Sequence, residues 1–137
     1  MNTKNENQYL LLFRGGKQME IASAQELQEI MERSRVWFEG LAAKGIVQGS
    51  HPLKSEAKLV SGKGGRTVVD GPFTESKEAI GGYLLLTASS FEEATAIAQA
   101  MPGLDYGSQI EVREIADECP LMTRARKLAS EPALATA

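Results

Sequence analysis

The sequence contains a single cysteine and a single histidine among its 137 residues. Cys119 has no second cysteine with which to form an internal disulfide, which agrees with a reducing compartment. It also has no histidine nearby that would activate it as a nucleophile. Clusters of histidine and cysteine ligands are excluded by these counts, so the sequence predicts no metal site and no bound cofactor.

Long hydrophobic runs and runs of basic residues are also missing. The longest apolar stretches, at Tyr9–Phe13 and Tyr83–Leu86, are far too short to span a bilayer. The opening segment, MNTKNENQ, is polar and lacks the apolar core of a signal peptide. The net charge is −3, without the basic patch expected of a nucleic-acid-binding protein. We therefore expect a cytoplasmic protein that binds neither membranes nor nucleic acids directly.

The first half of the chain predicts a strand followed by a long helix. The run Tyr9–Arg14 is apolar and ends at two glycines, as expected for a buried strand. Ser23 and Glu26 have the spacing of a capping box, and Gly45 supplies a left-handed helix stop. The inner face of this helix is expected at Leu27, Ile30, Met31, Ser34, Trp37, Phe38, Leu41 and Ala42.

The remaining elements predict a hairpin, a second helix and further strands. Ser61–Gly65 is typical of a hairpin tip and lacks the spacing of a phosphate-binding loop. Ser90 and Glu93 form a second capping box, and Pro102 follows the helix that they start. Its inner face is expected at Ala94, Ile97, Ala98 and Met101. The later strands are expected at 45–49, 57–60, 66–70, 82–87 and 109–114.

This order of elements predicts an α+β fold, a ferredoxin-like sandwich with an antiparallel sheet. We expect one domain over residues 1–118 and an extension over 119–137 that is partly helical and then disordered. The helices can cover only one face of the sheet, yet the strands at Tyr9–Phe13 and Tyr83–Leu86 are apolar on both faces. The simplest cover for the second face is a second copy, so we expect a homodimer.

The segment between the hairpin and the next strand opens with Asp70, Gly71, Pro72 and Phe73. Proline fixes its own φ and restricts the residue before it, so these residues predict a defined bend. Phe73 is expected to anchor the loop to the core, and Thr74 to cap a short turn. Such residues form turns first, so one interpretation is an elaborate strand connection. The other is a rigid loop that presents binding groups.

The stretch VVDGPFTESKEAIGGYLLL resembles the signature of the YCII-related proteins, in their DGPF branch, and the resemblance covers Tyr9–Ile115. It implies a dimeric α+β barrel built from ferredoxin-like subunits. Some members of this family look like small enzymes with a histidine–aspartate pair in a cleft. Members of the DGPF branch often lie beside, or are fused to, extracytoplasmic-function sigma factors.

The candidate site residues follow from these observations. Asp70 and His51 are the candidate catalytic acid–base groups, while His51 as an ordinary loop residue is the alternative. The candidate ligand-binding residues are Arg14, Phe73, Thr74 and Lys77. Arg14 lies at the end of the first strand, and the alternative for this residue is a solvated position on the surface.

Two functions of different classes remain open at this point. One is a small-molecule-binding protein with a cleft in a dimeric barrel, with or without acid–base catalysis. The other is a non-catalytic accessory or regulatory protein that acts with a partner such as a sigma factor. A pocket with convergent polar groups favours the first, and an exposed apolar patch outside the dimer interface favours the second.

Overall fold

The computed structural model describes residues 7–15, 23–71 and 80–131. Its six strands are β1 (Asn7–Arg14), β2 (Val47–Pro52), β3 (Lys58–Ser61), β4 (Thr67–Asp70), β5 (Ile80–Ala88) and β6 (Gln109–Glu114). Its helices are α2 (Ala24–Ala43), α3 (Phe91–Gln99) and α4 (Pro120–Ala129), with 3-10 turns η1 (Lys63–Gly65) and η3 (Pro102–Tyr106). None of the helices within these ranges is long and apolar enough to cross a membrane.

Four strands form one antiparallel sheet in the order β2-β5-β1-β6. The two apolar runs of the sequence, β1 and β5, are its central pair, with Leu11 opposite Leu84. Strands β3 and β4 form a separate two-stranded hairpin. With this hairpin inserted between the second and third strands of the sheet, the chain has the ferredoxin-like order of elements that the sequence predicts.

Helix α2 begins and ends where its capping residues place it. The Ser23 hydroxyl accepts a hydrogen bond from the Glu26 amide at 3.1 Å, and the Glu26 carboxylate accepts one from the Ser23 amide at 3.0 Å. This reciprocal pair satisfies amides that the first helical turn leaves without partners. Gly45 follows the helix with φ of 74°. Both predicted signals of this helix are confirmed.

Helix α3 is capped by a variant of the predicted box. The Ser90 hydroxyl accepts from the Glu93 amide at 3.0 Å, as expected. The Glu93 carboxylate, however, accepts from the amide and the hydroxyl of Ser89, one residue earlier than the cap. These two bonds lower the pKa of Glu93. The helix still starts at the predicted position, because the Ser90 hydroxyl caps its first turn.

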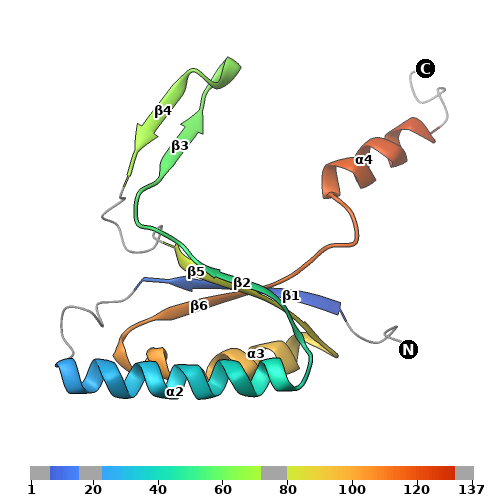
Figure 1. The fold of residues 1–137 in the computed structure, drawn as a ribbon. Coiled ribbons are helices and arrows are strands. Elements are labelled where there is room, and N and C mark those ends of the chain that lie inside the picture. The colour runs from blue at the N-terminus through green and yellow to red at the C-terminus, as the bar shows by residue number, and fades with distance from the viewer. Residues whose placement is uncertain (1–6, 16–22, 72–79, 132–137) are drawn as a thin grey trace.

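The core lies between the sheet and the two helices that cover it, α2 and α3 (Figure 1). Trp37 of α2 packs edge-to-face on Phe13 of β1, and its indole N–H donates to the Ile97 carbonyl of α3 at 3.1 Å. One side chain therefore joins the sheet to both helices. The buried core residues are Tyr9, Leu11, Leu41, Leu84, Leu86, Ala88, Ala94 and Ala98.

Two arms extend from the sheet on the side opposite these helices (Figure 1). One is the β3–β4 hairpin, and the other is α4 with the segment that leads to it. All residues of β3, β4 and α4 are exposed. The two arms leave one face of the four-stranded sheet without cover from the described part of this chain.

Two sequence predictions need correction. The second strand was expected at 45–49, but β2 runs through Val47–Pro52 because its pairing with β5 continues to Gly82. Met31 and Ala42 were assigned to the inner face of α2, yet both are exposed, Met31 to 68%, because the buried stripe of this helix is narrower. The extension contains the helix α4 over Pro120–Ala129.

Candidate functional site on the open face of the sheet

The uncovered face of the sheet carries the alternate residues of the central strands. Tyr9 and Leu11 are buried toward the helices, so Leu10 and Leu12 point to the opposite, open face. The cross-strand neighbours of Leu10 and Leu12 on β5 are Leu85 and Tyr83. These four side chains are half-buried and form an apolar strip along the middle of the open face.

His51 lies at one edge of this strip. Strand β2 pairs His51 with Tyr83 of β5, and the two ring centroids are 5.7 Å apart. His51 was expected to follow the second strand as a loop residue or to meet Asp70. It instead belongs to β2, and the ladder holds its backbone beside the apolar strip. An imidazole and a phenol thus lie together where the strip meets solvent.

Gly82 permits the close approach of β2 to β5 beside His51. A methyl group on Gly82 would lie 3.0 Å from the His51 carbonyl oxygen and 3.2 Å from the Pro52 Cα. Both are backbone atoms, which cannot rotate away as a side chain can. The end of β2 would therefore have to shift to admit any side chain at this position.

We expect Gly82→Ala to lower the free energy of unfolding by roughly 1–3 kcal/mol and to displace His51. Gly81→Ala is the matched control, since its methyl group would lie 3.8 Å from the nearest atom, the Phe13 carbonyl oxygen. Urea unfolding measures the stability, and the NMR shifts of the His51 and Tyr83 rings report the displacement. Equal behaviour of the two variants would show that β2 does not depend on Gly82.

The opposite edge of the strip carries a cluster of three charges. The Arg14 Nε and Nη2 donate to Glu111 Oε1 at 3.0 and 2.6 Å, and Arg113 Nη1 donates to Glu111 Oε2 at 2.9 Å. Both hydrogen bonds, the Arg113 bond foremost, lower the pKa of Glu111. Two guanidinium groups thus bind one carboxylate at this edge. The arrangement suits the acidic group of a ligand.

The lowered pKa of Glu111 predicts how its contribution depends on pH. Stability from a carboxylate with a depressed folded pKa is fully present above its unfolded pKa and is lost as pH falls through the folded value. Glu111→Gln should therefore lower the urea midpoint near neutral pH, and the deficit should shrink below about pH 4.3, the ordinary glutamate value. Glu29→Gln, on an exposed position of α2, is the control. A deficit that stays constant with pH would contradict this linkage.

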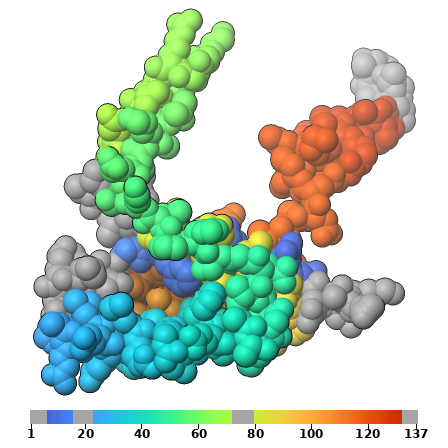
Figure 2. All heavy atoms as spheres, viewed as in Figure 1, coloured from blue at the N-terminus to red at the C-terminus, as the bar shows by residue number. Residues whose placement is uncertain are grey.

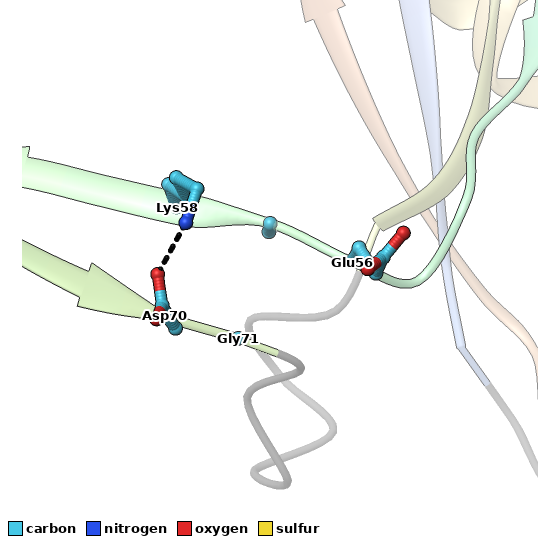
Figure 3. Close-up of a pocket in the computed structure, with 5 residues that line it drawn as sticks. Glu56, Lys58, Asp70 and Gly71 are labelled. Carbon is cyan, nitrogen blue, oxygen red and sulfur yellow. Dashed lines mark hydrogen bonds and ion pairs between the residues drawn. The ribbon is translucent and has the colours of Figure 1, made fainter.

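Asp70 lies at the base of the hairpin, away from the charge cluster. Its Oδ1 accepts from the Lys58 ammonium at 2.6 Å, with both side chains largely exposed (Figure 3). Below it the Gly71 amide donates to the Ala57 carbonyl at 2.6 Å and extends the hairpin ladder. These residues and Glu56 line a hollow of about 460 Å³. Such an exposed ion pair contributes only ~0–1 kcal/mol, so other groups can replace Lys58 at low cost.

The structure does not bring all the predicted site residues together. His51 and Asp70 are both described, and they form no hydrogen bond or ion pair with each other. Phe73, Thr74 and Lys77 lie outside the described residues. In the described ranges, no three histidine, cysteine, aspartate or glutamate side chains are grouped to hold a metal ion.

Sequence reasoning missed Tyr83, Glu111 and Arg113 as members of this surface. The alternation of Ile110 and Val112 with polar residues does indicate that Glu111 faces away from the core. The sequence carries no signal for its pairing with Arg14, because the register of β1 on β6 joins residues 97 positions apart. Tyr83 was assigned to a buried strand without regard to which face its ring occupies.

Comparison with protein families matches the model of the YCII-related domain to residues 8–117. The chain belongs to the YCII-related domain family. This match includes all four strands of the sheet, both helices that cover it and the hairpin. The YCII-related domain therefore contains every residue of the open-face surface, whereas α4 follows it. A search of curated proteins finds no match.

Two solved structures resemble this YCII-related domain at low sequence identity. One is the 5-chloro-2-hydroxyhydroquinone dehydrochlorinase TftG from Burkholderia phenoliruptrix, in complex with 2,5-dihydroxybenzoquinone. It has 19% identity and a TM-score of 0.46, covering 80% of this chain and 95% of that one. The other is an unknown protein from Galdieria sulphuraria, with 13% identity and a TM-score of 0.41. That match covers 85% of this chain and 53% of that one.

Proposed function

We propose that this YCII-related domain binds a small molecule on the open face of its sheet, in a cleft that closes when two copies pair face to face. The observation that carries this proposal is the arrangement around the apolar strip. His51 and Tyr83 lie at one edge, and the cluster of Arg14, Glu111 and Arg113 lies at the other. An apolar wall with a few convergent polar groups is the usual form of a small-molecule site.

The chemistry of the two edges defines the class of ligand. The apolar strip accepts a flat or aliphatic body, and the exposed Arg113 guanidinium at the other edge accepts an acidic group. The ligand proposed here is therefore a small organic acid. Pairing of two copies, in the dimeric α+β barrel proposed for this family, supplies the second wall that a bound ligand needs.

Acid–base catalysis at this site would use His51 first. Its imidazole lies against Tyr83 at the rim of the strip, and an imidazole is suited to moving a proton near neutral pH. Asp70 is the proposed second acid–base group. Its ion pair with Lys58 is exposed and contributes little, so the Asp70 carboxylate can exchange this contact for one with a ligand. A substrate bound against the strip would meet His51 directly, whereas Asp70 stands on the hairpin.

Methyl NMR of the full chain tests the binding proposal with benzoate as the probe. The methyl signals of Leu10, Leu12 and Leu85 should shift on titration, together with the His51 and Tyr83 rings. Leu11, Leu84 and Leu86 are buried on the other face and serve as internal controls. Benzyl alcohol, which lacks the carboxylate, should bind more weakly. Shifts that spare the open face, or none at millimolar benzoate, would refute the proposed ligand class.

A second candidate function has a specific observation in its favour. The hairpin and α4 carry exposed apolar side chains, which is the feature expected of an accessory protein that docks on a partner. A sigma factor of the extracytoplasmic-function class is the partner that the family resemblance implies. This candidate requires the arms to remain uncovered when the domain pairs with itself.

A further inference from the structure

The two arms have apolar surfaces that this chain does not cover. On the hairpin, Leu59 pairs with Val69 and Val60 with Val68. Neighbouring residues of a strand point to opposite faces, so each face of the hairpin carries one apolar pair. The four side chains are 46–60% exposed. A hairpin that is apolar on both faces fits between two surfaces, because water would otherwise contact one pair.

The C-terminal arm has the same property on one side. Leu121 and Leu128 are two helical turns apart and lie on one face of α4, with Met122 beside them. These three side chains are 50–77% exposed. A ten-residue helix and a two-stranded hairpin are both marginally stable alone in water. Both arms therefore need an external surface to hold the conformations that they have.

The position of the arms shows where the surface that covers them must lie. Both arms rise on the side of the open face, and no described part of the chain lies between them above the sheet (Figure 2). A body that covers the open face must therefore stand between the hairpin and α4. It then contacts the apolar strip and both arms together, so one occupant accounts for all three exposed surfaces.

We infer that this occupant is a second copy of the chain, and that each copy grips the other with its hairpin and its α4. The inference rests on the proposed pairing of the open faces and adds the arms to that interface. A twofold axis applies the same contacts to both copies, so all four arms are covered at once. The second copy also has arms of its own, which supply a second surface to a hairpin that is apolar on both faces.

A mixed dimer of the full, unmutated chain tests this inference directly. One copy carries ¹³C-labelled leucine and valine methyl groups, the other is unlabelled, and filtered NOEs report contacts between copies only. We expect such NOEs from Leu59, Val60, Val68 and Val69 on the hairpin and from Leu121 and Leu128 on α4. Contacts of Leu10, Leu12 and Leu85 report the open face separately.

The outcomes of this experiment separate a failure of the inference about the arms from a failure of the proposed face-to-face pairing. Contacts at the open face without contacts at the arms would overturn the inference and leave the arms available to another protein. Contacts at the arms without contacts at the open face would refute face-to-face pairing and overturn the inference, because the occupant would not cover the open face. A chain that stays monomeric at micromolar concentration would refute both.

A pair of variants adds an energetic measurement. Val60→Asp on the hairpin should weaken dimerisation at least tenfold in sedimentation equilibrium. Val36→Asp is the matched control, because Val36 is 56% exposed against 60% for Val60 but lies on α2, across the sheet from the arms. Its dissociation constant should stay within twofold of that of the original chain. Equal dissociation constants for the two variants would overturn the inference for the hairpin.

Discussion

Leu11→Ala is expected to lower the free energy of unfolding by roughly 3–5 kcal/mol. Leu11 is fully buried at the centre of the sheet, opposite Leu84 on β5 and Val112 on β6. The lost side-chain atoms would leave a cavity, because both neighbouring strands fix the backbone around it. Urea unfolding followed by circular dichroism measures this change.

The control for this variant is Met31→Ala on α2. The Met31 side chain is 68% exposed, so its removal takes away little buried surface, and alanine favours a helix. We expect a change of less than about 1 kcal/mol. If Leu11→Ala and Met31→Ala change the free energy of unfolding by similar amounts, the assignment of Leu11 to the core is wrong.

Leu85→Asp is expected to raise the dissociation constant of the dimer at least ~100-fold, or about 2.7 kcal/mol. Leu85 lies on β5 between Leu10 and Gly49, so no cation stands directly opposite the new carboxylate in the ladder. Pairing of the open faces would bury one such carboxylate from each copy without a partner, which costs several kcal/mol. Light scattering across a dilution series measures the dissociation.

The unmutated chain must first be dimeric, with an interface that buries more than roughly 1,600 Å² in total. Val36→Asp again serves as the control, since it adds the same charge on a surface helix. The domain should keep its fold as a monomer in Leu85→Asp, because the core on the other face is unchanged. A folded Leu85→Asp dimer of undiminished affinity would place the interface elsewhere.

The hairpin and the helix starts were predictable because each depends on residues close together in the sequence. Ser23 and Glu26 are three positions apart, and their reciprocal hydrogen bonds need no other part of the chain. Positive φ angles at Gly62, Gly64 and Gly65 close the hairpin where glycine has no steric cost. Signals of this kind are complete within one turn, so tertiary packing did not alter them.

The limits of β2 and the inner face of α2 were predicted less well. The strand continues through His51 and Pro52 only because β5 offers hydrogen-bonding partners there. Met31 has the spacing of an inner-face residue, but none of the described elements buries that side of the helix. The end of β2 and the burial of Met31 both depend on contacts with distant segments. A local sequence pattern carries no information about such contacts.

The sequence by itself determined the class of fold, its order of elements and the two apolar strands that leave one face of the sheet open. These follow from hydrophobic periods and local caps, whose physics acts within a few residues. Only the tertiary structure decided which polar groups share that face. Strand register places His51 beside Tyr83 and Arg14 beside Glu111. Register depends on how whole strands pack in the sheet, so no single stretch of sequence specifies it.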